Sequence, residues 1–453
     1  MAYLKTDEES RRLYKTLAKV ALPIALQSLI GSSLNLVDNL MVGALGESEL
    51  AAVGVGVQIF MVFFMLIYGF SSGCATFIAQ YHGAENRAGI KKSMGFTFMV
   101  CISIGVLFFI GGEFYPGKII RIFTDIPEIV SLGTVYVRTG APCFLIMAFT
   151  QTFETSLRAT QQTHLPLISS VTAFAANTIL NYILIFGHFG APALGVEGAA
   201  AATVLSRVLQ TFVLIFIVFF RRNIVAGRPR DYFGWTGDLS RRILKNSVPT
   251  MLNESLWGLG TAMYVAAFAR VGVTEYASVQ AGNTIQNVFI MAAFSIGDAI
   301  LILVGQQFGR GEMEKGEALA KRLLKAGVIV GLVLGLLLIA AARPIISLFN
   351  FTPAGMRYTF IILVVYGLFM SIVVYNSTII TGVLRAGGDT RFALIAETGT
   401  IWLYAVPAAF ITALYLHWPI YFCILAVRCE DLIKCVILTI RIRSGKWVRN
   451  VIN

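Results

Sequence analysis

The sequence predicts an all-α polytopic membrane protein, and three observations support this fold class. Hydrophobic residues make up 57% of the 453 residues, only 13% are charged, and the mean hydropathy is +0.76. Soluble domains typically carry about 25% charged residues. Apolar stretches recur along the whole chain, and an apolar helix of about 20 residues is long enough to cross a bilayer. The chain is therefore predicted to cross a membrane many times.

Hydropathy predicts twelve transmembrane helices. They are expected at residues 17–43, 50–80, 93–112, 132–157, 165–187, 195–220, 246–271, 277–305, 323–348, 358–384, 392–415 and 418–440. The charged N-terminal segment has no short apolar region followed by a cleavage site, so we expect no removable signal peptide. One connection is long: residues 221–245 contain seven Lys and Arg residues and divide the chain into six helices plus six.

The distribution of Lys and Arg predicts the orientation in the membrane. Basic residues gather in connections after even-numbered spans, as in GAENRAGIKK (residues 83–92), and are nearly absent from the others. Cytoplasmic loops carry this excess, so both termini and the linker are expected in the cytoplasm and the protein in the cell (inner or plasma) membrane. Nucleic-acid binding is the rival explanation for a net charge of +12. The charge lies in short loops beside the membrane, so we expect no nucleic-acid partner.

The two halves of the chain resemble each other at a nearly constant shift of 226 residues. Pro23 corresponds to Pro249, and the loop GESELAAV corresponds to GVTEYASV. QYHG likewise corresponds to QQFG, and, one residue later, the two LRA motifs coincide. We therefore predict an N-terminal six-helix lobe (residues 1–220), a basic linker (221–245) and a C-terminal six-helix lobe (246–453). An even number of spans per repeat relates the lobes by a pseudo-two-fold axis along the membrane normal.

Several motifs together resemble the multidrug and toxic compound extrusion (MATE) transporters. They are LPIALQSL (22–29), VDNLMVG (37–43), NTILNYILIFG (177–187) and LRAGGDTRF (384–392). The resemblance covers essentially the whole chain. It implies a monomeric antiporter in the lipid bilayer that exports lipophilic, often cationic drugs in exchange for protons or sodium ions by alternating access. No cofactor other than the coupling ion is implied.

Two other functions compete with drug antiport. Flippases for polysaccharides or lipid-linked precursors share the same superfamily plan. They need a cationic cavity for a phosphate-bearing substrate, and Arg207 is the main candidate here. An integral-membrane enzyme would need a catalytic motif, but the chain has no H-E-x-x-H, no phosphate-binding G-x-x-x-x-G-K and no G-x-S-x-G. We therefore expect no enzymatic activity.

Asp38 is a carboxylate within an apolar span, where insertion costs about 2.5–3.5 kcal/mol near the helix centre. It lies five residues before the outer end of its helix, a depth of about 7 Å. Asn181 and Thr203 reach similar depths in two later spans, and Asn177 lies one turn from Asn181 on the same face. A purely structural role is the alternative, in which Asp38 caps a backbone break or pairs with Arg207.

The resemblance assigns these same residues to the cation or proton site of the N-terminal lobe: Asp38, Asn177, Asn181 and Thr203. Some family members have the motif LDP where this chain has LNY, so a second carboxylate is missing. We therefore favour protons over sodium, although Na⁺ at Asp38 stays open. Pro23 matches a family proline at which the first helix bends, and an ordinary tolerated kink is its alternative explanation.

The C-terminal lobe offers a weaker site. The acids that sodium-coupled relatives carry in helices seven and ten are missing, and Trp257 stands at the helix-seven position. Glu254 and Asp298 are candidates for an inner gate or a second proton site, or they bond only to neighbouring helices. Glu397 is ambiguous for the same reason. Glu154 and Arg158, four residues apart, are expected to form a structural pair.

Overall fold

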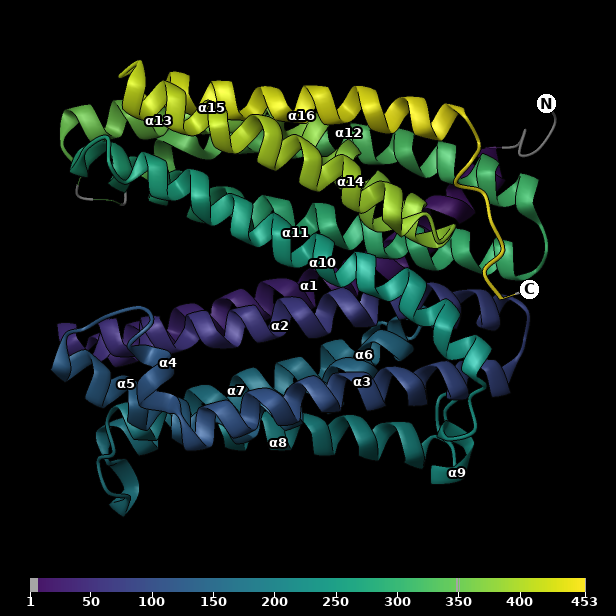
Figure 1. Cartoon of the computed structure of the whole chain (residues 1–453), viewed down its shortest axis with the longest axis horizontal. Coiled ribbons are helices and arrows are strands. Elements are labelled where there is room, and N and C mark those ends of the chain that lie inside the picture. The colour runs from purple at the N-terminus through teal and green to yellow at the C-terminus, as the bar shows by residue number, and fades with distance from the viewer. Residues whose placement is uncertain (1–6, 348, 350, 453) are drawn as a thin grey trace. The chain divides into compact units, whose positions relative to one another are not determined.

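The computed structural model describes residues 7–347, 349 and 351–452, and those residues form helices joined by short connections (Figure 1). Residue contacts divide the chain into two compact units. The N-terminal unit comprises residues 22–78 and 85–244, and the C-terminal unit comprises residues 1–21, 79–84 and 245–453. The boundaries of the two lobes and the linker remain a prediction from the sequence repeat.

The first half of the chain forms eight long or medium helices and two short ones. They are α1 (Asp7–Gly43), α2 (Glu47–Gly83), α3 (Arg87–Phe114), α4 (Pro116–Ile120), α5 (Pro127–Gly140), α6 (Pro142–Ala159), α7 (His164–Phe186), the 3-10 turn η1 (His188–Gly190), α8 (Val196–Phe220) and α9 (Pro229–Tyr232). Within the N-terminal unit α7 packs along α8, and α3 packs along α6 (Figure 1).

The second half contains longer helices and three π-helical segments. They are α10 (Gly237–Phe268), α11 (Val273–Gly309), α12 (Met313–Ile346), α13 (Pro353–Ser377), η2 (Thr378–Leu384), α14 (Thr390–Thr400), η3 (Ile401–Ala405), α15 (Val406–Phe410), η4 (Ile411–Tyr415) and α16 (Ile420–Arg443). In the C-terminal unit α13 packs against α11, α12 and α16, and aliphatic side chains such as Ile362, Met370 and Val374 form the core between them.

The twelve-helix prediction is confirmed. In the described part of the chain, nine helices or continuous helical stretches are long and apolar enough to cross a bilayer. A tenth span consists of α5 and α6, which meet at a 46° bend, so the single helix expected at 132–157 is broken. Pro142 begins α6 at that bend and has no backbone N–H to continue the helix ladder. The remaining two spans are α10 and α16, which form as helices but carry more polar residues.

Local sequence signals explain where several helices begin and end. Proline occupies the first turn of α5, α6 and α13, where its missing N–H costs no helical hydrogen bond. The side chain of Asn86 caps α3 by accepting a hydrogen bond from the backbone N–H of Gly89 (2.8 Å). Gly187 ends α7 with a φ of +76°, a left-handed conformation that glycine adopts without strain.

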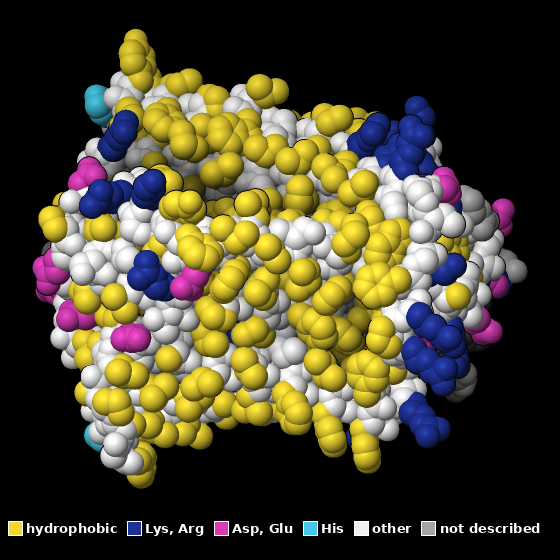
Figure 2. Space-filling model, turned by 60° about the horizontal axis from the view of Figure 1, so that its bottom comes forward, with side chains coloured by type: hydrophobic (Ala, Val, Ile, Leu, Met, Phe, Trp, Pro, Cys, Tyr) yellow, Lys and Arg dark blue, Asp and Glu magenta, His cyan; other side chains and the backbone are white. Residues whose placement is uncertain are grey.

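The surface of the molecule is apolar in its middle region. On the face drawn in Figure 2, hydrophobic side chains cover most of the surface and Lys and Arg gather near one end. One contribution comes from α8, where Phe212, Phe216 and Phe220 are spaced one turn apart, stack pairwise and are all exposed. An exposed apolar face is stable only against lipid, so this surface fits the transmembrane assignment.

The basic linker is ordered and docks on the N-terminal unit. Its backbone at Tyr232 approaches Gly95 of α3 so closely that a Cβ atom added to Gly95 would lie 1.8 Å from the Tyr232 carbonyl oxygen. Trp235 packs edge-on against Phe96, with ring centroids 5.7 Å apart. Lys91 forms an ion pair with Asp231 at 3.2 Å. The linker is thus held to α3 by packing and charge together.

The two Q-x-x-G motifs contact each other in the C-terminal unit. A Cβ atom added to Gly83 would lie 2.0 Å from the Gln306 carbonyl oxygen, and one added to Gly309 would lie 1.9 Å from the Gln80 carbonyl oxygen. The Gln80 side chain also donates to the Ala386 carbonyl oxygen (2.9 Å) and accepts from the backbone N–H of Val451 (2.8 Å). Glycine is required at both positions because the backbones pass without room for a side chain.

Gly83→Ala is expected to lower the stability of the protein by about 1–3 kcal/mol, because the methyl group would overlap backbone atoms that cannot move independently. Gly54→Ala is the matched control in the same helix, since nothing lies within 4 Å of its added Cβ. The control should be neutral or up to about 1 kcal/mol more stable, because alanine favours helix more than glycine. The thermal unfolding midpoints of both variants in detergent test this, and equal midpoints would contradict it.

Candidate functional site

The structure brings the four predicted N-terminal site residues together from three helices. The Nδ2 group of Asn181 donates hydrogen bonds to the Asp38 carboxylate (2.5 Å) and to Oδ1 of Asn177 (3.2 Å). The Nδ2 group of Asn177 in turn approaches Oγ1 of Thr203 at 3.5 Å, and that hydroxyl donates to the Ala199 carbonyl oxygen (3.0 Å). These contacts form a continuous polar chain from α1 through α7 to α8. Their use as an ion site remains a prediction.

One atom in this chain lacks a hydrogen-bond partner. Asn177 and Asn181 are fully buried, and Oδ1 of Asn181 makes no hydrogen bond within the described structure. A buried carbonyl oxygen without a partner is costly, and such atoms often mark a place where an ion or water binds. Carboxylate, amide and hydroxyl oxygens are donors that hard cations prefer. The same atoms also suit a protonated carboxyl, because rotation of the amide would let Oδ1 accept its proton.

Arg207 takes part in a different network from the one considered for Asp38. Its NH1 group donates to Oε1 of Gln210 (2.8 Å), and Nε2 of Gln210 donates to Oε1 of Glu154 (2.9 Å). Glu154 also accepts from Gln27 (3.0 Å) and lies 3.4 Å from Arg158, the pair expected from the sequence. Burial together with these four partners makes Glu154 the centre of the second polar cluster in the N-terminal unit.

Gln27 and Gln210 are polar site residues that the sequence prediction missed. Gln27 lies one helical turn after Pro23 on α1, and α1 is continuous through that proline. A glutamine in an apolar span was the available signal, but its partner Glu154 lies 127 residues away and only the tertiary structure identifies it. The bend assigned to Pro23 stays a prediction.

The two acids considered for the C-terminal half lie on different helices. Glu254, on α10, forms a short ion pair with the almost fully buried guanidinium of Arg385. Asp298 lies on α11 and is half-buried. Glu254 is thus engaged in a charge pair, and a role in gating or proton transfer remains a prediction for both.

A denser cluster surrounds Glu397, which the sequence left ambiguous. Asn253 on α10 donates to the Glu397 carboxylate (2.5 Å), and Lys434 on α16 lies 4.0 Å from it. Lys434 forms a closer ion pair with Glu430 at 2.8 Å. The signal that was available in the sequence is the run RCEDLIKC, which inserts five charged or polar-capable positions into an otherwise apolar span.

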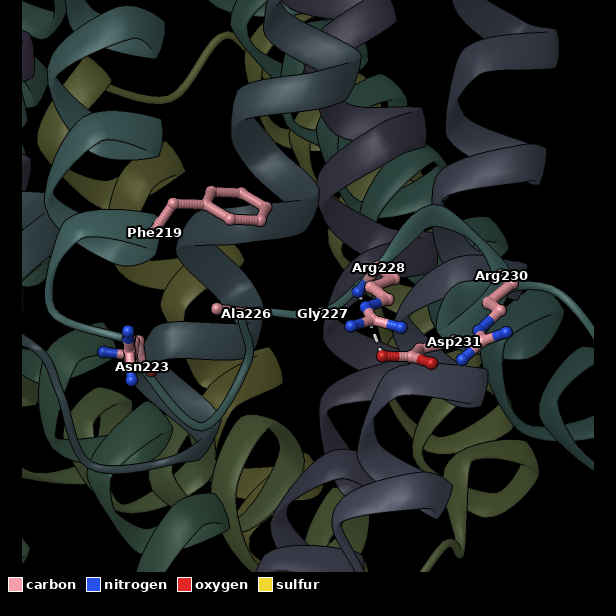
Figure 3. A pocket seen from close by; sticks show the side chains of 8 residues that line it. Phe219, Asn223, Ala226, Gly227, Arg228, Arg230 and Asp231 are labelled. Atoms are coloured by element: carbon pink, nitrogen blue, oxygen red, sulfur yellow. Dashed lines mark hydrogen bonds between the residues drawn. The ribbon is translucent and has the colours of Figure 1, made fainter.

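A surface pocket of about 620 Å³ lies beside the linker (Figure 3). It is lined by Phe219, Arg222, Asn223, Ala226, Gly227, Arg228, Arg230 and Asp231. The backbone N–H of Arg228 donates to Asp231 (3.0 Å), and this bond holds the pKa of the exposed Asp231 carboxyl below its usual range. Burial raises the pKa of the neighbouring Tyr232 to about 12, so its hydroxyl stays a neutral donor to the Val225 carbonyl oxygen. None of the predicted ion-site residues lines this pocket.

Asn181→Ala is expected to reduce transport by roughly 10- to 100-fold, because hydrogen bonds to charged groups contribute about 1.5–3 kcal/mol. The change removes the donor to Asp38 and interrupts the contact with Asn177. Thr178→Val is the matched control on the same helix, since that hydroxyl bonds only to the Phe174 carbonyl oxygen in the described structure (2.9 Å). Initial transport rates at equal amounts of reconstituted protein provide the measurement. Equal losses in both variants would mean that the Asp38 contact has no special role.

Comparison with known proteins identifies relatives that span nearly the same length. A probable multidrug resistance protein NorM of Thermotoga maritima is 26% identical over 451 residues, covering 98% of this chain and 95% of the relative. A probable multidrug resistance protein YoeA of Bacillus subtilis is 26% identical over 423 residues, covering 91% of this chain and 90% of the relative.

Solved structures share the fold. A MATE protein in complex with MaL6 has a TM-score of 0.87 at 20% identity, covering 96% of this chain and 97% of that one. A MOP superfamily transporter from Pyrococcus furiosus has a TM-score of 0.85 at 20% identity with the same coverage. A family model named MatE matches residues 23–183 and 248–411, one segment in each half and together more than half of the chain. The chain therefore belongs to the MatE (MATE) family of transporters, the family that its sequence motifs resemble.

Proposed function

We propose that this protein is a secondary active multidrug efflux antiporter that exports lipophilic, often cationic compounds in exchange for an ion. Family membership supports a transporter rather than an enzyme. The two relatives that carry multidrug resistance names support drugs as the substrate class. The observation that carries the ion coupling is the contact of Asp38 with Asn181, an acid in an apolar span bonded to a buried amide.

The coupling ion proposed for Asp38 is the proton. The site contains one carboxylate and otherwise neutral amide and hydroxyl groups from Asn177, Asn181 and Thr203. A single carboxylate becomes neutral when it binds one proton, which removes the cost of a charge in the membrane. Protonation then changes the relative free energies of the outward- and inward-open states, and this is what couples ion movement to transport. Sodium is the second candidate, because the unpartnered oxygen of Asn181 is a suitable ligand.

The membrane orientation proposed from the loop charges has both termini and the linker in the cytoplasm of a cell with a plasma or inner membrane. Pro23 on α1 is proposed as the position at which the helix carrying Asp38 bends, because a proline in a helix interior weakens the hydrogen-bond ladder. A bend there would move Asp38 relative to α7 and α8 and so change its access to water.

A flippase for phosphate-bearing lipids is less favoured. Such a substrate needs unpaired cationic side chains, and Arg207 was the main candidate. Arg207 donates to Gln210, and Arg158 bonds to Gln27 and Glu154. Both guanidinium groups are therefore used inside the N-terminal unit.

Asp38→Asn is expected to insert and fold, because it removes a costly group, and to lose ion-driven efflux. The assay is export of a cationic dye from vesicles under an imposed proton gradient or, separately, an imposed sodium gradient. Wild-type protein should export dye mainly under the proton gradient, and the variant should match empty vesicles under both. Asp298→Asn is the comparison variant and should retain more activity. Full activity of Asp38→Asn under either gradient, or the reverse order of the two variants, would contradict the proposal.

Asn181→Asp is expected to raise the ratio of sodium-driven to proton-driven efflux. The new carboxylate would lie within hydrogen-bonding distance of Asp38, and two such acids cannot both ionise unless a cation or a shared proton lies between them. The site would then bind Na⁺ more tightly and release its proton less readily. The ratio is measured in the same vesicles under the two gradients. An unchanged ratio would show that charge at this position does not select the ion.

A further inference from the structure

The C-terminal unit contains a buried ion-pair cluster that has more carboxylates than cations. Glu254 pairs with Arg385, and Asp431 pairs with Arg428 at 3.4 Å. The remaining cation, Lys434, then faces two carboxylates. Its Nζ lies 2.8 Å from Glu430 and 4.0 Å from Glu397, with a further 4.0 Å approach to Asp431. Fully ionised, the cluster would carry one uncompensated negative charge inside the membrane, and such a charge is strongly unfavourable.

Of these acids, Glu397 has the weakest cationic partner. A separation of 4.0 Å from Lys434 is too long for a hydrogen bond. Its close partner is the neutral amide of Asn253, whereas Glu430 has both Lys434 and the hydroxyl of Thr400. Glu254 and Arg385 also act on Glu397 electrostatically, with opposite signs. The extra proton that the cluster requires therefore belongs on Glu397.

A second, independent observation points to a bound proton at this position. Asn253 is about 98% buried, and its Oδ1 atom has no hydrogen-bond partner in the described structure. The Nδ2 atom of the same amide contacts Glu397, so the unpartnered oxygen lies beside that carboxyl. If the amide rotates, Oδ1 accepts a hydrogen bond from a protonated Glu397 and is no longer unsatisfied. Asn181 has the same unpartnered oxygen beside Asp38.

The sequence repeat relates this cluster to the polar residues of the N-terminal half. At the shift of 226 residues, Asn253 corresponds to Gln27, which bonds Glu154. At 227 residues, Lys434 corresponds to Arg207 and Glu430 to Thr203 of the predicted ion site. The duplicated scaffold thus carries a polar cluster at equivalent positions in both halves, with the acids on different helices.

We propose that Glu397 is a second proton-binding site of the transporter. It takes a proton from water when its side is exposed and returns it to water on the other side, with Lys434 keeping Glu430 ionised throughout. No other group is consumed or released. The use of this proton in transport rests on the proposed antiport function, whereas the binding of the proton does not.

The first experiment counts protons bound by the purified full-length protein between about pH 5.5 and 9, a range in which ordinary exposed acids stay ionised. Glu397→Gln should bind one proton fewer per molecule than the wild type, because Gln keeps an acceptor for Asn253 but does not titrate. Lys434→Gln should bind one proton more, because Glu430 then loses its cation. Glu317→Gln is the control: it also pairs with a lysine four residues later but is exposed, so the count should not change.

An unchanged count in Glu397→Gln would overturn the proposal, as would an unchanged count in Lys434→Gln if the first variant did not fold. The second experiment measures the protons moved per dye cation exported, and this ratio should fall by one in Glu397→Gln. A lower proton count with an unchanged ratio would show a structural acid without a role in coupling. Failure of the proposed function appears separately, as full activity of Asp38→Asn, and it would leave the proton count of Glu397→Gln unaffected.

Discussion

The absence of water in the hydrocarbon core is the constraint on which the rest of this structure depends. Every polar group within a span must find a partner in the protein, because none is available in lipid. The backbone meets this requirement as helices, and the buried side chains meet it as clusters that connect several helices. Glu154, Glu397 and Glu430 are each held by groups from other helices or other turns. The charged residues are few, and their partners therefore determine where chemistry can occur.

Two positions depart from this rule in the same way. Asn181 and Asn253 each donate to a carboxylate from a buried amide whose oxygen has no partner. An amide can exchange donor and acceptor by rotating, so it can bond either an ionised or a protonated acid at little cost. A neighbour of this kind suits an acid that changes its protonation state, whereas a guanidinium partner such as Arg385 keeps its acid ionised.

Duplication supplied a scaffold but did not fix the chemistry on it. The Q-x-x-G motifs of both halves serve the same purpose, since Gly83 and Gly309 allow close backbone contact in an equivalent way. The polar positions have diverged: Thr203 corresponds to Glu430, and Asp38 corresponds to Tyr264. Small residues at helix contacts are constrained by backbone distance, whereas polar residues are constrained only by having a partner. The two halves can therefore keep one architecture and hold their acids on different helices.

The sequence by itself determined the fold class, the number of helices and the family. Apolar length, loop charge and a repeat in fixed register are local properties of the chain, and they are read without tertiary contacts. The sequence also nominated Asp38, Asn177, Asn181 and Thr203, because helix depth and the i, i+4 spacing follow from helix geometry alone.

Only the tertiary structure decided which polar groups are partners. The break between α5 and α6, the use of Arg207 by Gln210 rather than Asp38, and the cluster around Lys434 all depend on how helices face one another. Hydropathy gives the depth of a residue but not the direction in which its side chain points around the helix axis. Glu397 and Asn253 are 144 residues apart in the chain, and packing of α10 against the later helices, rather than any pattern near either residue, brings that acid and that amide together.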